Sequence, residues 1–412
     1  MSLEAALDAL LAAARPLCVE ETQAVSTFDA LGRVLAQDLV SPLDVPPADN
    51  TSMDGYAMRV ADVPAPGTVL PVKQRIPAGA APHPLEPGTA ARIFTGAFIP
   101  EGADAVVMQE QCEPQSDGAQ VRVGIVPQPR QWIRDRGEDV RRGDVVLAAG
   151  TTLTPQALGL AAGVGAATLN VRRRVRVALM STGDELVMPG DVAPDKLPFG
   201  AIYNSNRFTL RGLLTACGCE VSDLGIVPDK LDATMARFRE AGQGHDLIVS
   251  TGGVSVGEED HVRPALAVVG HVALWQLAIK PGKPLAFGAV RREGPSSGEA
   301  LFLGLPGNPV SSFVTFLLAA LPLIRTLQGA AATRPQPLPM RADFDWTKPD
   351  TKRREFIRVR RNDTGGLDVF ANQSSGVLTS AVWGDGLADL AAGQVVKRGD
   401  TLPFIPWSAF GL

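Results

Sequence analysis

Between residues 173 and 329, short apolar runs alternate with segments whose apolar residues recur at helical spacing. The apolar runs are predicted to be buried strands, and they lie at 175–180, 221–227, 246–250, 285–287 and 301–303. The segments 208–216 and 231–240, and the long apolar run after residue 309, are predicted to be helices. Strands that alternate with helices favour a doubly wound, parallel sheet in this part of the chain.

The rest of the chain follows three other patterns, so we predict a multidomain α/β protein. Residues 1–45 and 146–172 favour a helical linking domain, in which Thr154 caps a helix that begins at Pro155 and packs on the N-terminal helix. Residues 46–145 carry proline or glycine every few positions between short β-type runs, which predicts an inserted β-rich lobe. Residues 330–412 show short alternating runs and tight turns, which favour a C-terminal β-barrel-like domain.

Four loops of unusual composition lie at the ends of predicted strands in the 173–329 segment. They are STGDE from Ser181, STGGVSVG from Ser250, KPGKP from Lys280 and GLPGNP from Gly304. Ligand-binding loops of a doubly wound sheet lie at the carboxyl ends of its strands, so we expect these four loops to meet around one ligand.

The STGGVSVG loop stands between a predicted strand and a predicted helix, which is the arrangement of an anion-binding cradle. We expect a phosphate to contact its backbone amides and hydroxyls, at Ser250, Thr251, Gly252, Gly253 and Ser255. Glu258, Glu259 and Asp260 follow directly, and carboxylates beside such a cradle indicate a divalent metal between them and the phosphate. The alternative for this loop alone is a glycine-rich turn before a solvated acidic helix start.

Composition narrows the class of protein. The 412 residues carry a formal net charge of −5, which argues against general nucleic-acid binding. Glu4 and Asp8 interrupt the first apolar run, so no signal peptide is expected, and the run 310–324 is too short to span a membrane. With four cysteines and no CxxC, we expect a cytoplasmic protein. Cys217 and Cys219 form a possible metal pair with His245 or His261, but structural thiols are the favoured interpretation.

Several motifs together resemble one known family along nearly the whole chain. In chain order they are DNTSMDGYA from Asp49, IFTGA from Ile93, GEDV from Gly137, STGDEL from Ser181, YNSN from Tyr203, STGGVSVGEED from Ser250, KPGKP from Lys280 and GLPGNPVS from Gly304. They resemble the molybdopterin molybdenumtransferases, the MoeA-type family related to the E domain of gephyrin. Thr51 and Asn204 depart from the residues that are commoner in that family, serine and aspartate.

The resemblance implies an elongated, four-domain homodimer that transfers molybdate to adenylylated molybdopterin and releases AMP, with Mg²⁺ assisting. It implies contacts with an upstream molybdopterin adenylyltransferase and with downstream proteins that accept the cofactor. Active sites shared between subunits are expected, because the resemblance places the lobe of one subunit across the cleft of the other.

The resemblance also gives roles to individual residues. Glu185, Asp229 and Asp260 are candidate Mg²⁺ ligands, although Asp229 could equally begin a turn. Lys283, Lys280 and Ser311 are expected near the oxyanion, with Pro306 and Pro309 in the adjoining loop; a solvated surface lysine is the alternative for Lys280. The lobe residues Asp54, Thr95 and Asp139 complete the predicted catalytic set with Glu185, Asp260 and Lys283.

The C-terminal match is looser, and it leaves the identity of an anion-binding arginine and serine open. Arg358 and Ser374 are our candidates, with Arg354 and Ser375 as neighbours in the same two motifs.

Two other functions remain open from the sequence. A molybdopterin adenylyltransferase uses the same sheet with STGGVSVG-like loops, although the extra domains and the two loop lysines favour the molybdate step. A non-catalytic scaffold that retains the fold is the other alternative, and the intact acidic residues weigh against it. No histidine lies near Ser181, Ser250 or Thr251, so a covalent nucleophile is not expected.

Overall fold

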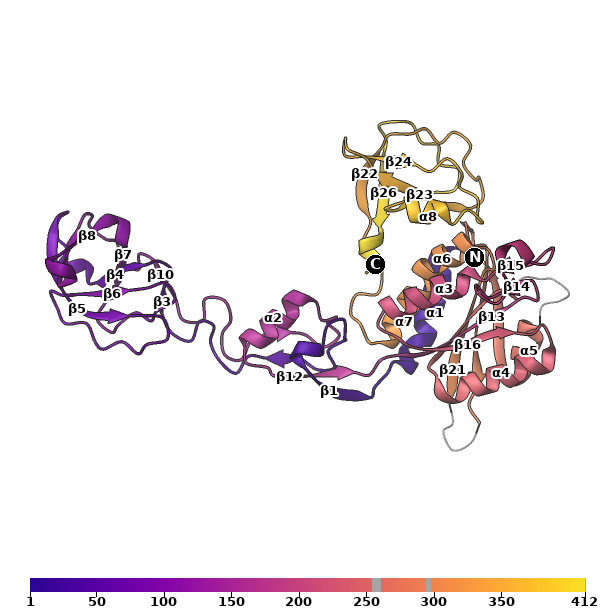
Figure 1. The fold of residues 1–412 in the computed structure, drawn as a ribbon, viewed down its shortest axis with the longest axis horizontal. Helices are drawn as coiled ribbons and strands as arrows, with labels where there is room; N and C mark the ends of the chain where they lie inside the picture. The colour runs from indigo at the N-terminus through magenta and orange to yellow at the C-terminus, as the bar shows by residue number, and fades with distance from the viewer. Residues whose placement is uncertain (254–260, 294–297, 412) are drawn as a thin grey trace.

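The protein is an elongated molecule with four structural parts. A computed structural model describes residues 1–253, 261–293 and 298–411. Figure 1 shows a β-rich lobe at one end, a narrow linking region in the middle, and an α/β domain with a β-barrel above it at the other end. The predicted multidomain α/β fold class is therefore confirmed.

The α/β domain is built on a six-stranded sheet in the order β16-β13-β17-β21-β20-β18. Its strands are β13 (Arg176–Thr182), β16 (Glu220–Val227), β17 (Leu247–Thr251), β18 (Gly270–Gln276), β20 (Pro284–Arg291) and β21 (Glu299–Leu305). The strands β16, β13, β17 and β21 run parallel to one another, as predicted. The prediction of a parallel sheet was wrong for β20, which pairs antiparallel with β21. The strand β18 was not predicted, and it pairs antiparallel with β20; the short connections around these strands cannot make a crossover.

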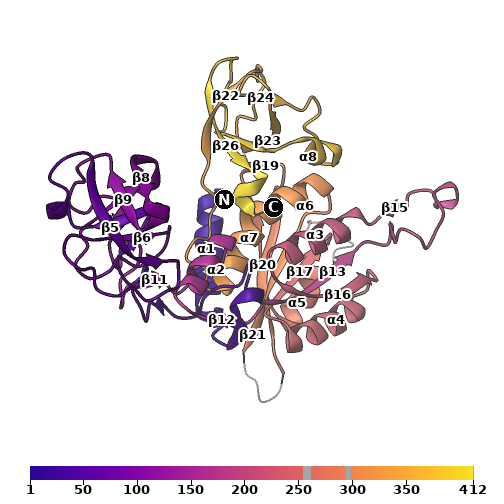
Figure 2. The ribbon, with the colours of Figure 1, turned by 60° about the vertical axis from the view of Figure 1, so that its left-hand side comes forward.

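Helices cover both faces of this sheet (Figures 1 and 2), which confirms the doubly wound arrangement. Their bounds are α1 (Leu3–Ala14), α3 (Ser205–Ala216), α4 (Leu231–Gly244), α5 (Val262–Val269), α6 (Pro309–Thr315) and α7 (Leu321–Leu327). On one face Leu179 and Val249 pack against α1, α3, α6 and α7. On the other face Ile248 and Phe302 pack against α4 and α5, including an edge-on contact between Phe302 and Phe238.

The linking region is less helical than predicted. Its α-helix, α2 (Pro155–Gly163), begins as expected. The Thr154 hydroxyl caps it by accepting a hydrogen bond from the Ala157 amide at 3.3 Å. The other elements are a 3₁₀ turn (Thr27–Asp29) and short strands, which pair as β1 (Thr22–Ser26) with β12 (Thr168–Arg172) and β2 (Leu39–Val40) with β11 (Val145–Leu147).

The expected packing of α2 on the N-terminal helix was also wrong. The apolar side chains of α1, such as Leu7 and Leu10, are buried in the core of the α/β domain, whereas Ala157 and Ala161 of α2 belong to a separate small core. A helix with a continuous apolar face buries more area against a large helix layer than against small strand pairs.

The lobe contains an open sheet in the order β7-β4-β6-β5-β9-β8. Its strands are β4 (Gly55–Met58), β5 (Thr68–Ile76), β6 (Ala90–Ile93), β7 (Ala105–Met108), β8 (Cys112–Gln115) and β9 (Gln120–Val123). Two small apolar clusters fill the lobe, one containing Tyr56 and Val107 and the other containing Ile76 and Ile93.

The C-terminal domain is a closed barrel, as predicted. Its five strands are β22 (Leu338–Ala342), β23 (Arg354–Arg361), β24 (Gly366–Val369), β25 (Gly386–Leu390) and β26 (Thr401–Pro406), and each pairs with two others. The short strand β19 (Ile279–Lys280) of the KPGKP loop pairs with β23 and ties the barrel to the α/β domain.

The last helical segment of the α/β domain is longer than the apolar run at 310–324 suggested. It extends over Pro309–Leu327, 19 residues, and is long and apolar enough to cross a membrane, which corrects the prediction from length. However, 83% of its apolar window is buried inside the molecule, so it is packed as a core helix.

A half-buried ion pair joins the linking region to the start of β17. The two terminal nitrogens of Arg173, Nη1 and Nη2, donate hydrogen bonds to the Asp246 carboxylate at 2.7 and 3.0 Å. The backbone amide of Arg176 donates to the same carboxylate at 2.8 Å. Burial alone would raise the pKa of Asp246, but these hydrogen bonds and the arginine charges outweigh burial and lower it. The ion pair therefore stabilises the fold above about pH 4 and stops doing so as the pH falls through the lowered pKa.

We expect Asp246→Asn to lower the free energy of unfolding by roughly 1–3 kcal/mol at neutral pH, because Arg173 loses its half-buried partner and keeps only the exposed Glu21. Denaturant unfolding of the full chain at pH 7 and at lower pH measures this loss, and the difference between variant and wild type should shrink below about pH 4. Glu240→Gln is the matched control, since its pair with Arg237 is exposed and should change stability by less than about 1 kcal/mol. Equal stability of Asp246→Asn and wild type at pH 7 would contradict this account of the junction.

Candidate functional site

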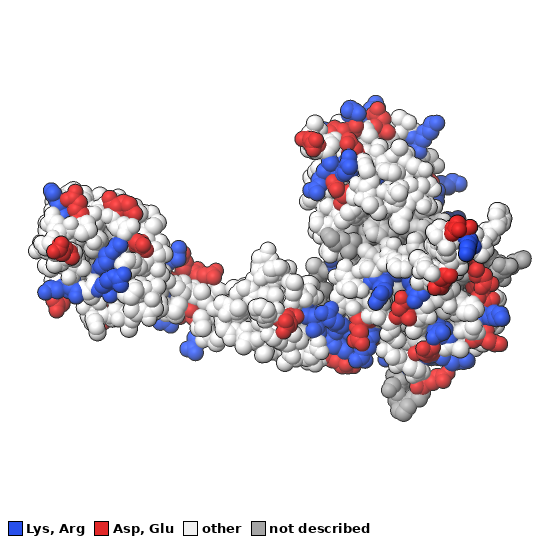
Figure 3. All heavy atoms as spheres, in the orientation of Figure 1, with Lys and Arg blue, Asp and Glu red and all other residues white. Residues whose placement is uncertain are grey.

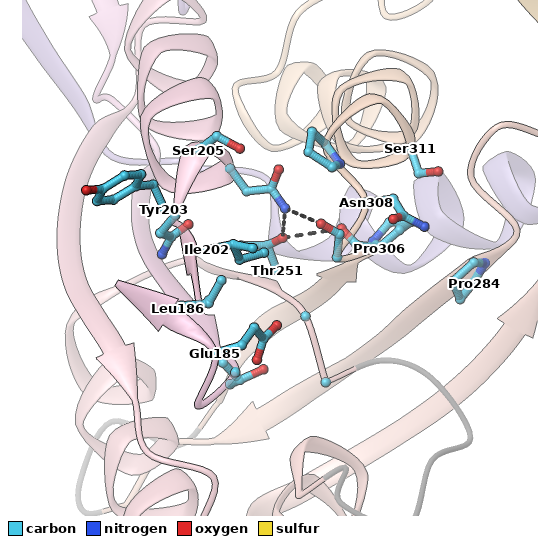
Figure 4. Close-up of a pocket in the computed structure, with 18 of the residues that line it drawn as sticks. Glu185, Leu186, Ile202, Tyr203, Ser205, Thr251, Pro284, Pro306, Asn308 and Ser311 are labelled. Carbon is cyan, nitrogen blue, oxygen red and sulfur yellow. Dashed lines mark hydrogen bonds between the residues drawn. The ribbon is translucent and has the colours of Figure 1, made fainter. Parts of the chain in front are cut away.

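A cavity of about 550 Å³ lies at the carboxyl ends of β13, β17 and β21. Loops from STGDE, STGGVSVG, KPGKP and GLPGNP all contribute to its lining, as the sequence predicted for the edge of a doubly wound sheet. The predicted site residues that line it are Glu185, Asp229, Thr251, Gly252, Gly253, Pro306, Pro309 and Ser311. Figure 4 shows side chains from these loops around the cavity.

A hydrogen-bonded junction holds three of these segments together. The Asn206 carboxamide, in the first turn of α3, donates to the Thr251 hydroxyl at 2.9 Å and to the Gly307 carbonyl at 2.7 Å. The Thr251 hydroxyl donates in turn to the Pro306 carbonyl at 3.3 Å (dashed lines in Figure 4). One side-chain amide therefore fixes the positions of α3, the end of β17 and the GLPGNP loop relative to one another.

Glycine allows the β17 loop to lie directly on the end of β13. Gly252 has a φ of +86°, and a Cβ atom there would lie 2.4 Å from the Thr182 carbonyl oxygen. Any other residue would have to push the two loops apart, since that distance is well below a van der Waals contact. Backbone at this point is therefore exposed to the cavity, as an anion-binding loop requires.

Three acidic side chains gather beside the cavity. Glu185 and Asp229 line it, and the Asp229 amide donates to the Asp184 carboxylate at 3.4 Å. Burial raises the pKa of Asp229, and the negative charges of Asp184 and Glu185 raise it further. The group therefore holds more negative charge than its surroundings compensate, which favours a bound cation.

These carboxylates do not form a complete metal cage by themselves. Within residues 1–253, 261–293 and 298–411, no three acidic, histidine or cysteine side chains come together closely enough to hold a metal ion. The predicted ligand Asp260 and the predicted phosphate contact Ser255 lie outside the described residues. Ser250 is fully buried within β17, so Thr251, the next residue, is the one that faces the cavity.

The two lysines of the KPGKP loop have different environments. The Lys280 ammonium donates to the Glu355 carboxylate at 3.0 Å, and Glu355 is 1% exposed and also accepts from the Trp346 indole. Lys280 therefore joins the loop to the barrel, and its charge is already compensated. Lys283 is exposed and immediately precedes Pro284, which lines the cavity, and within the described residues it makes no ion pair.

Of the two candidate arginines in the barrel, only Arg358 has no carboxylate partner among the described residues. Arg354 pairs with Asp389 and Glu4, whereas Arg358 donates to the Ser380 hydroxyl at 2.9 Å and to the Ser374 carbonyl at 3.2 Å. Arg358 is 1% exposed, and burial lowers its pKa to about 10.

The barrel loop that carries Ser374 reaches the edge of the cavity. The Ser375 carbonyl accepts the Val310 amide at 2.9 Å, and Val310 lies between Pro309 and Ser311, which both line the cavity. The predicted arginine and serine therefore adjoin the site through this loop, while the Arg358 guanidinium itself is buried.

The three predicted site residues of the lobe, Asp54, Thr95 and Asp139, do not line the cavity of their own chain. Asp54 precedes β4 and Thr95 follows β6, and both strands lie in the lobe at the far end of the molecule (Figure 1). The Asp54 carboxylate accepts the Thr95 amide at 2.8 Å and the Thr95 hydroxyl at 2.7 Å, and these bonds lower its pKa. Asp139 is exposed on the same lobe, and its amide donates to the Val45 carbonyl at 3.0 Å.

Some cavity residues were not predicted as site residues. Asn206 is the most important, and Tyr203 and Asn308 also line the cavity. The YNSN and GLPGNP motifs contained these residues, but an asparagine in the first turn of a helix is usually interpreted as a cap. In the structure Asn204, and not Asn206, caps α3: its side-chain oxygen accepts a hydrogen bond from the Arg207 amide at 3.1 Å.

Asn206→Ala is expected to loosen the three joined segments. Removing two hydrogen bonds should lower the free energy of unfolding by about 1–3 kcal/mol. Amide hydrogen exchange should also become faster in residues 251–253 and 306–308, and mass spectrometry of the deuterated protein measures this locally. Ser205→Ala, in the same turn and also lining the cavity, is the control and should leave exchange in both loops unchanged. Unchanged exchange in Asn206→Ala would show that the junction does not hold the loops.

Comparison with known protein families divides the chain into three matched regions. Residues 1–165 match the MoeA N-terminal region (domain I and II), and residues 178–326 match the probable molybdopterin binding domain. Residues 339–407 match the MoeA C-terminal region (domain IV).

Individual relatives and a solved structure agree with these matches. The molybdopterin molybdenumtransferase of Synechococcus elongatus is 38% identical over 404 residues, which cover 96% of each chain. That of Haemophilus influenzae is 44% identical over 309 residues, 75% of this chain and 74% of the relative. The crystal structure of the molybdopterin biosynthesis MoeA protein from Pyrococcus horikoshii OT3 superposes with a TM-score of 0.80 at 28% identity, over 98% of this chain and 99% of that one.

Proposed function

The chain belongs to the MoeA family of molybdopterin molybdenumtransferases, and from that premise we propose that it inserts molybdenum into molybdopterin during molybdenum cofactor biosynthesis. We propose further that the substrates are adenylylated molybdopterin and molybdate, and that AMP is released with the help of Mg²⁺. The observation that supports this most is the cavity at the carboxyl ends of β13, β17 and β21, where glycine-rich backbone faces a group of carboxylates.

The phosphate end of the pterin substrate is assigned to the β17 loop. Thr251, Gly252 and Gly253 line the cavity, and exposed backbone amides in a glycine loop favour a phosphate. The Asn206 junction supports this assignment, because it keeps the loop in position before the substrate binds.

Mg²⁺ fits the donor set beside this loop. The ion takes one or two carboxylates together with substrate phosphate oxygens and waters, so Glu185 and Asp229 are sufficient protein ligands, with Asp260 as a further candidate. When bound, Mg²⁺ would reduce the charge repulsion between anionic substrates. Burial raises the pKa of Asp229 first, and the negative charges of Asp184 and Glu185 raise it further; those two charges support a cation at this position.

Molybdate is assigned to the side of the cavity formed by the KPGKP loop and the start of α6. Two unit negative charges about 4 Å apart repel by roughly 4 kcal/mol at an effective dielectric of 20, so a fixed cation is needed there. Lys283 can supply it, since it is exposed and without an ion pair among the described residues, and Ser311 can donate a hydrogen bond. Lys280 is better explained as a positioning residue, because Glu355 already compensates its charge.

We infer that the working unit is a homodimer with shared active sites. The Asp54 and Thr95 pair lies on the lobe, and Figure 1 shows the lobe apart from the α/β domain of its own chain. A lobe held outward in this way can complete the cleft of a second copy. A cytoplasmic location, and contacts with an upstream adenylyltransferase and with cofactor-accepting proteins, belong to the same proposal.

The direct test is reconstitution of the purified chain with adenylylated molybdopterin, molybdate and Mg²⁺, followed by measurement of AMP release. Release of AMP that requires molybdate supports the proposal. ATP consumption with unmodified molybdopterin, and no molybdate-dependent release of AMP, would instead identify an adenylyltransferase. No reaction in either assay would leave a scaffold as the better explanation.

Glu185→Gln should raise the Mg²⁺ concentration needed for half-maximal AMP release by about ten- to a hundredfold, because the amide cannot replace a carboxylate ligand. A Mg²⁺ titration at fixed, saturating substrates measures the shift. Asp195→Asn removes an exposed carboxylate outside the cavity and should leave the titration unchanged. If both variants titrate like the wild type, Glu185 does not contribute to a metal site.

Lys283→Ala should raise the KM for molybdate by about tenfold or more, since one charge-assisted hydrogen bond is lost. The binding of adenylylated molybdopterin, measured by equilibrium titration without molybdate, should change little. A weaker pterin affinity with an unchanged KM for molybdate would place Lys283 at the pterin phosphate instead.

A further inference from the structure

A second cavity, of about 420 Å³, lies on the lobe rather than at the ends of the α/β sheet. Three of its lining residues are the cations Lys73, Arg75 and Arg92, and Tyr56 forms part of its floor. The cavity is of the size that usually accommodates a small organic ligand, and it is larger than a bare oxyanion requires.

Strand register brings the cations together. Arg75 of β5 stands opposite Arg92 of β6, and Tyr56 of β4 stands on the other side of Arg92. Ala91 and Ile93, the neighbours of Arg92 in β6, belong to an apolar cluster, so alternation along the strand turns Arg92 to the opposite face. Figure 3 shows basic side chains gathered over the β4–β6 part of the lobe.

Aromatic rings hold the two arginines in place. The Arg75 guanidinium carbon lies 4.4 Å from the centre of the Phe94 ring, and the Arg92 guanidinium carbon lies 4.6 Å from the same ring and 5.1 Å from that of Tyr56. Arg92 also donates to the Gly55 carbonyl at 2.9 Å and to the Gln109 side chain at 2.6 Å. Guanidinium groups fixed in this way lose little further conformational entropy when a ligand binds.

The charge of this group is not compensated within the described part of the chain. None of Lys73, Arg75 and Arg92 makes an ion pair there, whereas four other arginines of the lobe do: Arg59 with Asp62, Arg122 with Glu113, Arg130 with Asp49, and Arg136 with Asp44. A concave surface with several unpaired cations attracts anions and concentrates them. Planar guanidinium groups in particular suit the oxygen pairs of a phosphate.

One lining residue of the cavity, Arg92, lies next to the predicted catalytic pair of the lobe. Arg92 donates to the carbonyl of Gly55, the residue after Asp54, and its charge contributes to the lowered pKa of Asp54 after the hydrogen bonds from Thr95. A ligand held by Arg92 would therefore lie beside the Asp54 and Thr95 pair.

We propose that the lobe cavity binds the phosphate group of a nucleoside monophosphate through Lys73, Arg75 and Arg92. This inference rests on the proposed function for the identity of the ligand, which is AMP, either free as the product or as the adenylyl part of the substrate. The lobe then contributes a nucleotide-phosphate site, in addition to Asp54 and Thr95, to the cleft that it completes.

The test is calorimetric titration of the full-length protein with AMP, adenosine and inorganic phosphate at low salt. Lys73→Gln/Arg75→Gln removes two exposed cations that lie outside the predicted catalytic set. Its Kd for AMP should rise by about tenfold or more, while adenosine, which lacks the phosphate, should show no difference between the variant and the wild type. Arg75→Lys keeps the charge but not the planar group, so its Kd for AMP should lie between that of the wild type and that of the double variant.

Arg122→Gln is the matched control, because Arg122 is an exposed arginine of the same lobe outside the cavity. Equal AMP affinity in wild type and double variant, no AMP binding by the wild type, or an equal loss in Arg122→Gln would overturn the proposal. If inorganic phosphate binds as tightly as AMP and with the same dependence on the variant, the phosphate site stands but the nucleotide assignment fails. The titration needs no turnover, so it tests the cavity even if the reconstituted protein releases no AMP.

Discussion

The Asn206 carboxamide makes the contact on which the geometry of the main site depends. Its hydrogen bonds to Thr251 and Gly307 join the first turn of α3 to two loops at the ends of β17 and β21. Gly252 adds the end of β13 to these joined segments, because a residue without a Cβ atom can lie directly against it. Net hydrogen-bond energies are small, about 1 kcal/mol each, so the importance of the contact lies in position and not in total stability. With the loops fixed, backbone amides and carboxylates face one cavity.

Features set by local sequence could be predicted. The strands β13, β17 and β21 were predicted from their apolar runs to within a few residues at each end. The cap at Thr154 was predicted because a threonine before proline satisfies the first turn of a helix by itself. The meeting of four loops at one cavity also followed from the sequence, since the carboxyl ends of parallel strands share an edge.

Features set by contacts between distant segments could not be predicted. Periodicity shows that α1 has an apolar face but not which core buries it, so its placement on the α/β domain was missed. Lys280 has the composition of an anion-binding loop residue, and only the pairing of β19 with β23 reveals that Glu355 compensates its charge. Asn206 and the stacked arginines of the lobe became visible only when their partners were placed in space.

The central claim is that the cleft of one chain is completed by the lobe of another, because the lobe is held away from its own α/β domain (Figure 1). Asp54→Ala alters the lobe and Glu185→Ala alters the cleft, and each variant alone should be inactive in AMP release. Mixing equal amounts after dissociation and reassociation should restore about a quarter of wild-type activity, because half of the dimers then contain one intact site of two. No recovery, with heterodimers verified by mass spectrometry, would contradict the claim and place each complete site within one chain.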